Sequence, residues 1–155
     1  MTDIVDKTTR SRMMAGIRGK DTKPELAIRK ALHAMGFRFR LHRKDLPGRP
    51  DIVLPKYQLV IFVHGCFWHR HPGCSFAATP ATRPKFWKAK LEGNRRRDVE
   101  KQKALRDQGW RVFTVWECGI RHDPEDLMRQ LAVTIQNAKV FEADFPSTPP
   151  LPKQK

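Results

Sequence analysis

The sequence is poor in cysteine, in long apolar stretches and in acidic residues. Its 155 residues include three cysteines, an odd number that argues against a disulfide framework and favours a reducing, cytoplasmic compartment. No run of about 18 apolar residues occurs, and residues 1–20 lack the apolar stretch of an export signal, so we expect no membrane segment. The length suits one domain with its own core.

Acidic residues are outnumbered by basic ones, 16 Asp and Glu against 31 Lys and Arg, which gives a formal net charge of +15. Such a charge attracts polyanions, so nucleic acid is the expected partner. Charge alone does not separate an enzyme from a basic binding protein. The four tryptophans and nine phenylalanines, several of them beside basic residues, exceed what a solvated basic tail requires.

Residues 1–20 carry several basic side chains with little apolar periodicity. We interpret them as a basic N-terminal arm that orders on a phosphate backbone, or as a solvated terminus. The first helix is predicted to begin at Thr22, because Thr22 and Glu25 have the spacing of a capping box, and to stop at Gly36. The cap explains Glu25 structurally, so a catalytic role for it needs a separate argument.

The rest of the chain alternates between strand and helix signals. Strands are expected at residues 37–41, 52–54, 57–63 and 110–116, with a long helix at 82–108 and a last helix from Asp123. This order predicts an α/β fold, a single domain at residues 21–140 with a central mixed β-sheet flanked by helices. The proline-rich composition of residues 141–155 predicts a disordered tail.

Candidate chemical groups are concentrated between Leu59 and Phe76. A buried strand breaks at His64-Gly65, and cysteines, histidines and aromatic residues follow it closely. Asp51 precedes the strand predicted at residues 52–54. A hairpin-like pairing of this strand with the one that starts at Leu59 would bring Asp51 near the end of the latter. There it could bind Mg²⁺, although a cap of the turn after Pro50 explains it equally well.

Four residues have the chemistry of a structural zinc site: Cys66, His71, Cys74 and Cys118. The alternative is three free buried thiols. His69 competes with His71 for the zinc, because Cys66-x-x-His69 is also a chelating spacing. Residues two apart in an extended loop point to opposite sides, so one histidine can bind zinc while the other faces Asp51.

The helix predicted at residues 82–108 begins with Phe86 and Trp87 among lysines and continues through Arg95, Arg96 and Arg97. A run of charge on a helix often marks only a solvated face. Because aromatic residues accompany this run, we interpret it as a face that meets phosphates.

Five segments together resemble the very short patch repair endonucleases of bacteria: Arg49-Pro50-Asp51, Val60–His69, Phe86-Trp87, Gly109–Val112 and Val115–Cys118. The similarity runs over residues 6–126. It implies a restriction-endonuclease-like fold and a Mg²⁺-dependent, strand-specific nick 5′ to the thymine of a T:G mismatch, formed by deamination of 5-methylcytosine. It also implies a monomer at the bacterial nucleoid, with mismatch-repair proteins of the MutL/MutS type as partners.

The resemblance assigns roles to single residues. Asp51 and the main-chain carbonyl of Val63 would hold Mg²⁺. His69 would activate water, with His64 and Asp98 as an auxiliary His–Asp pair. Glu25 would be a helix acid that supports the site. Three aromatic residues would wedge into the DNA duplex: Phe67, Trp68 and Trp87. Four residues would bind the structural zinc ion: Cys66, His71, Cys74 and Cys118.

Two departures from common nuclease patterns stand out. Pro72-Gly73 adds one residue between His71 and Cys74 relative to the family. No acid-x-Lys follows Asp51, and the family also lacks that lysine, so His69 would replace it. Two other functions fit the same residues: a restriction-type endonuclease that cuts both strands, and a non-catalytic, zinc-stabilised DNA-binding module.

Overall fold

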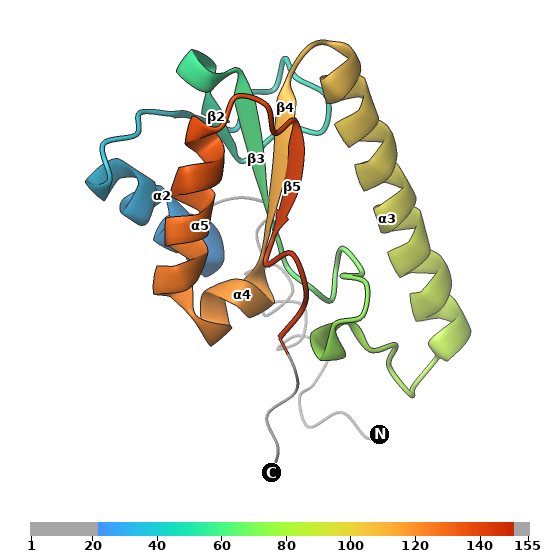
Figure 1. Ribbon diagram of the computed structural model, residues 1–155. Helices are drawn as coiled ribbons and strands as arrows, with labels where there is room; N and C mark the ends of the chain where they lie inside the picture. Colours follow the sequence, from blue (N-terminus) through green and yellow to red (C-terminus); the bar gives the residue numbers. More distant parts are fainter. Residues whose placement is uncertain (1–21, 151–155) are drawn as a thin grey trace.

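A five-stranded mixed sheet runs through the computed structural model, which describes residues 22–150 (Figure 1). The basic arm predicted at residues 1–20 lies outside them. The main elements follow in the order α2 (Lys23–Ala34), β1 (Arg40–Leu41), β2 (Ile52–Leu54), β3 (Leu59–His64), α3 (Pro84–Asp107), β4 (Arg111–Trp116), α4 (Glu117–His122), α5 (Pro124–Gln136) and β5 (Glu142–Phe145). Within residues 22–150, no helix is both long and apolar enough to cross a bilayer.

The strands lie in the sheet in the order of the sequence, but their directions change at β3. β1, β2 and β3 pair antiparallel, whereas β3, β4 and β5 pair parallel. The parallel pairing sets His64 beside Trp116, so β3 and β4 end at the same edge of the sheet. Residues that follow these two strands are therefore brought together, although some 50 residues separate them in sequence.

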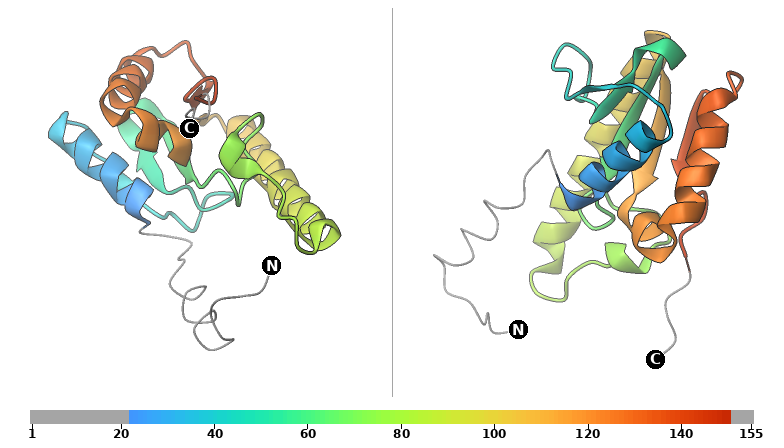
Figure 2. Two further views of the ribbon diagram at one scale, coloured as in Figure 1. Left: turned by 90° about the horizontal axis from the view of Figure 1, so that it is seen from below. Right: turned by 90° about the vertical axis from the view of Figure 1, so that its left-hand side faces the viewer.

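Helices cover both faces of the sheet, as the views in Figures 1 and 2 show: α2 and α5 on one face and α3 on the other. On the first face, Ile28 of α2 and Leu131 of α5 belong to one buried apolar cluster with Ile61 and Phe113 of the sheet. On the second face, Leu105 of α3 packs in a smaller cluster around Val60 and Val112. Two covered faces explain why β4 is buried at every position.

The prediction was wrong at three places. The strand expected at residues 37–41 is reduced to Arg40–Leu41, because Phe37 turns into the core directly after α2. The short helix α4 follows β4 without a loop and was not predicted. The disordered tail expected from residue 141 is wrong at its start, where β5 pairs with β4 and buries Phe145. The sequence EADF has too little apolar alternation to reveal this strand.

Arg111, at the start of β4, fastens α5 to the sheet. Its guanidinium is buried and donates hydrogen bonds to the carbonyls of residues at the carboxyl end of α5 and beyond it, at 3.0 Å to Ile135, 3.0 Å to Thr134, 2.9 Å to Asn137 and 2.8 Å to Val140. A cation at a helix carboxyl end also interacts favourably with the helix dipole. The role of Arg111 is therefore to hold α5 against the sheet and not to bind DNA.

We predict that Arg111→Met lowers the free energy of unfolding by about 3 kcal/mol or more, because each buried carbonyl left unsatisfied costs about 1–3 kcal/mol. Urea unfolding followed by circular dichroism measures the change. Arg129→Met is the matched control, since that side chain is 71% exposed on α5 and should change stability by less than about 0.5 kcal/mol. Equal effects of the two substitutions would contradict this role of Arg111.

Candidate active site

The antiparallel pairing of β2 and β3 brings Asp51 to the carboxyl end of β3, as expected. The Val63 amide donates a hydrogen bond of 2.7 Å to the Asp51 carboxylate. Burial raises the pKa of the Asp51 carboxyl to about 7, because the charged form loses its hydration. The Val63 amide opposes this shift and the nearby Glu25 adds to it. Near neutral pH, a proton and a cation can therefore compete for this carboxylate.

His69 lies in the turn that follows β3, and Asp98 of α3 orients its ring. The Nδ1 atom of His69 is 2.6 Å from an Asp98 carboxylate oxygen. With Nδ1 donating to the carboxylate, the other ring nitrogen, Nε2, is free to accept a proton. This is the state that a general base requires.

His64 stacks on His69 instead of pairing with Asp98. The two imidazole planes are 3.7 Å apart between centroids and 5° from parallel. His64 and Asp98, the expected auxiliary pair, still lie close together, since ligand atoms of His64, His69 and Asp98 are all within 4.8 Å of one another, but the hydrogen bond of Asp98 goes to His69. Burial lowers the pKa of His64 well below its usual range, so this ring is a neutral, flat support.

Asp51 and His69 line the same cavity, which has a volume of about 290 Å³. Val63, His64 and Asp98 line it as well. Two cationic side chains, Arg49 and Lys101, complete a lining that suits an anionic substrate. The carboxylate at position 51 and the imidazole at position 69, which were predicted to meet, thus face one cavity.

Glu25 is an almost fully buried carboxylate, 1% exposed, on α2. Its backbone amide donates to Thr22 Oγ1 at 3.4 Å, which confirms the predicted cap. One carboxylate oxygen lies 2.5 Å from Arg29 and 2.5 Å from His42. His42 was not predicted as a neighbour of Glu25. The pairing of residues 40–41 with 52–53 could have revealed it, because the same register sets His42 opposite Asp51.

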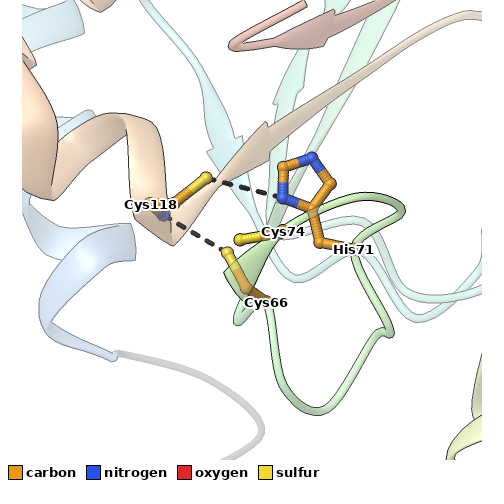
Figure 3. A group of neighbouring side chains, drawn as sticks. All are labelled: Cys66, His71, Cys74 and Cys118. Atoms are coloured by element: carbon orange, nitrogen blue, oxygen red, sulfur yellow. Dashed lines mark hydrogen bonds between the residues drawn. The ribbon is translucent and has the colours of Figure 1, made fainter. Parts of the chain in front are cut away.

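Four potential metal ligands converge beside the end of β3, as Figure 3 shows: Cys66, His71, Cys74 and Cys118. Their ligand atoms all lie within 4.8 Å of one another, although Cys118 comes from the start of α4 and the others from the loop after β3. His71, not His69, lies with the three cysteines in this cluster, while His69 lies with His64 and Asp98. Three thiols and an imidazole form a donor set that could hold a metal ion.

The pKa values of His71, Cys66 and Cys118 are all shifted by burial in this Cys/His cluster. Burial lowers the pKa of His71 to about 4, which leaves its ring neutral. Burial raises the pKa of the Cys66 thiol to about 11 and that of Cys118 still further. Without a cation these thiols stay protonated, and a bound metal ion would supply the charge that stabilises the thiolates. The additional residue at Pro72-Gly73 does not separate His71 from Cys74, since the Cys74 amide donates to the His71 carbonyl at 3.3 Å.

An aromatic cluster lies next to the histidines and consists of Phe67, Trp68 and Trp87. The ring centroids of Trp87 are 5.6 Å from those of Phe67 and 6.0 Å from those of Trp68. The cluster therefore joins the turn after β3 to the start of α3. From there α3 carries the exposed basic side chains predicted to face phosphates, namely Lys85, Lys88, Lys90, Arg95, Arg96 and Arg97.

Comparison with known proteins agrees with the resemblance. A family model described as DNA mismatch endonuclease Vsr matches residues 2–75. The chain is 53% identical over 118 residues to the Type II nicking enzyme V.XorIIP of Xanthomonas oryzae pv. oryzae, which covers 76% of this chain and 86% of that protein. It is 46% identical to the DNA mismatch endonuclease Vsr of Escherichia coli over 121 residues, which are 78% of this chain and 77% of that protein.

A third relative is the Type II nicking enzyme V.NmeAIP of Neisseria meningitidis, 43% identical over 122 residues, which cover 79% of this chain and 86% of that protein. These identities extend over most of each chain. In the structure, Asp51 and His69 line one cavity. The chain therefore belongs to the Vsr family of DNA mismatch endonucleases, and it is a nicking endonuclease.

Proposed function

We propose that this protein is a Mg²⁺-dependent endonuclease that nicks one DNA strand 5′ to the thymine of a T:G mismatch, formed by deamination of 5-methylcytosine, and so starts very short patch repair. The observation that carries the proposal is the shared cavity of Asp51 and His69, with Asp98 holding the His69 ring. Family membership and the net charge of +15 support a double-stranded DNA substrate.

The residues at the end of β3 fit a hard divalent cation. Asp51 and the main-chain carbonyl of Val63 offer oxygen ligands, which Mg²⁺ prefers, and leave most of its coordination positions to water and phosphate. When bound, Mg²⁺ neutralises charge on the phosphate and on the leaving 3′-oxygen. Arg49 and Lys101 in the cavity lining attract the same phosphate.

His69 performs the proton transfer in this proposal. Its Nε2 accepts a proton from the attacking water, and Asp98 stabilises the resulting imidazolium through Nδ1. His64, stacked on the ring and neutral, restricts its rotation without adding a competing charge. Glu25 supports Asp51 from α2 rather than touching the water.

The aromatic cluster of Phe67, Trp68 and Trp87 serves as a wedge into the base stack. Opening a base step costs a few kcal/mol, and a wobble-paired T:G should open more easily than a matched pair. Deformation energy therefore contributes to mismatch selectivity. Phe67 and Trp68 of the wedge belong to the same turn after β3 as His69, so insertion sets the strand position that His69 meets.

The Cys66–His71–Cys74–Cys118 cluster is assigned to a structural zinc ion. Zinc prefers four sulfur and nitrogen ligands in a closed tetrahedral site. Such an ion fixes the turn that carries His69 and Trp68 to the end of β4. We further propose a restriction-endonuclease-like fold and a cytoplasmic monomer that acts at the nucleoid alongside mismatch-repair proteins of the MutL/MutS type.

Asp51→Asn and His69→Gln should each lower the rate of nicking of a T:G duplex in Mg²⁺ by at least about 100-fold, because losing a general base alone costs about 10²–10⁴ in rate. DNA binding, measured by fluorescence anisotropy, should change little. His122→Gln, at an exposed position on α4, is the control and should keep the parent rate. Undiminished nicking by either variant would remove that residue from the mechanism. Cleavage of both strands of a matched duplex would instead identify a restriction-type enzyme.

Trp87→Ala should weaken binding to a T:G duplex by about 1–3 kcal/mol, the usual value of one base–aromatic contact. Binding to a matched duplex should fall much less, so the ratio of the two dissociation constants is the measurement. Phe141→Ala removes an aromatic side chain that is 62% exposed and lies outside the wedge, and it should leave the ratio unchanged. Equal losses on both duplexes would contradict the wedge.

Cys118→Ser should release zinc and lower the melting temperature, because three ligands of the loop then lose their link to α4. Native mass spectrometry counts the zinc, and calorimetry gives the melting temperature. His122→Ser removes a side chain near the cluster in sequence but outside it, and it should retain the ion. A Cys118→Ser protein with unchanged zinc content would show that Cys118 is not a ligand.

A further inference from the structure

We propose that Trp116 is a positioning residue for His69, whose ring it holds in place through His64. The inference rests on the proposed function in one respect only, that His69 is the general base. It assigns Trp116, the last residue of β4, which belongs to none of the roles above, a part in orienting that base.

Four aromatic rings contact one another in series from the Cys/His cluster to the cavity that holds His69. His71 of the cluster lies parallel to Trp116, with ring centroids 4.0 Å apart and planes 8° from parallel. Trp116 meets His64 edge to face, at 5.3 Å and 74°. His64 in turn lies parallel to His69, at 3.7 Å and 5°. Each ring therefore limits the orientation of the next one.

The three inner rings of this series have little room to turn. Trp116, His64 and His71 are 6%, 4% and 5% exposed, and side chains in such close-packed surroundings keep one orientation. The outer ring, His69, has 31% of its side chain exposed, so its orientation depends on His64 at its face and on Asp98 at its Nδ1 atom. Without the indole behind it, His64 would no longer hold the His69 ring against Asp98.

Two simpler explanations account for Trp116 less completely. It packs against Cys66 and Cys118, so it could serve only as apolar cover, but leucine would give such cover without a flat face. A hydrogen bond does not explain the indole either, because its buried Nε1 has no partner within residues 22–150. The Asp144 carboxyl, whose pKa burial raises and the indole lowers, is near but outside hydrogen-bond geometry. The remaining property of the indole is a flat face that contacts two imidazoles.

The test compares Trp116→Leu, which keeps apolar cover, with Trp116→Phe, which keeps a flat ring, in the full-length, zinc-loaded protein. Trp110→Leu is the matched control, because this tryptophan precedes β4 and packs in the other cluster, around Leu105. Nicking of a T:G duplex in Mg²⁺ gives kcat and KM, and native mass spectrometry gives zinc per chain. Nitrogen NMR of the histidine rings, without DNA, shows which nitrogen of His69 carries the proton, and His69→Gln assigns the signal.

We expect Trp116→Leu to lower kcat per zinc-loaded chain by about 10-fold to 100-fold and to change KM by less than about threefold, because a small displacement of a catalytic group lowers the rate without weakening binding. Trp116→Phe and Trp110→Leu should keep kcat within about threefold of the parent. The parent and Trp116→Phe should hold the His69 proton on Nδ1, toward Asp98, whereas Trp116→Leu should show a mixture of the two tautomers.

An unchanged His69 tautomer in Trp116→Leu would overturn the proposal, as would a kcat like that of the parent. Equal losses in Trp116→Phe and Trp116→Leu would also overturn it, because the flat ring would then not be the property that matters. A loss of kcat that only follows the loss of zinc, in Trp116→Leu and in Trp116→Met, would show that Trp116 serves the metal cluster alone. The tautomer does not depend on nicking, so the proposed function fails separately, through undiminished nicking by His69→Gln.

Discussion

Pairing along β3 is the constraint on which the rest of the site depends. On one side, the antiparallel pairing with β2 delivers the Asp51 carboxylate to the Val63 amide. On the other side, the parallel pairing with β4 delivers Cys118 to the loop that carries Cys66. A shift of either register by one residue would turn each side chain to the opposite face of the sheet. The site is thus positioned by the backbone hydrogen bonds of the sheet.

The buried carboxylates near the end of β3 lose their hydration, and neighbouring groups replace it with hydrogen bonds and ion pairs. Glu25 is buried beside Arg29 and His42, and Asp51 accepts a backbone amide in place of water. An isolated buried carboxylate would be strongly unfavourable, which is why its neighbours matter for stability as well as for chemistry. Burial of the Asp51 carboxylate nevertheless raises its pKa to about 7.

Much of the site could be predicted from the sequence because its groups are close together along the chain. A short segment contains the strand ending at His64, the potential metal ligands Cys66, His71 and Cys74, and two of the aromatic residues. The capping residue Thr22 and the strand after Pro50 were equally visible from local patterns. These predictions required spacing and periodicity alone.

What could not be predicted depends on tertiary contacts. The hydrogen bond between His69 and Asp98 joins the turn after β3 to α3, and the spacing of the two residues in sequence does not reveal it. The position of His42 opposite Asp51 needs the register of a two-residue strand. β5 owes its place to the exposed edge of β4 rather than to its own composition.

The central claim is that Asp51 and His69 act together on one cation and one water. A crystal structure of the protein with a T:G duplex and Ca²⁺ in place of Mg²⁺ tests it most directly. We expect Ca²⁺ within about 2.3–2.6 Å of an Asp51 oxygen and a water in hydrogen-bond reach of His69 Nε2 facing the phosphorus 5′ to the thymine. A cation bound away from Asp51, or a His69 ring turned away from the phosphate, would contradict the claim.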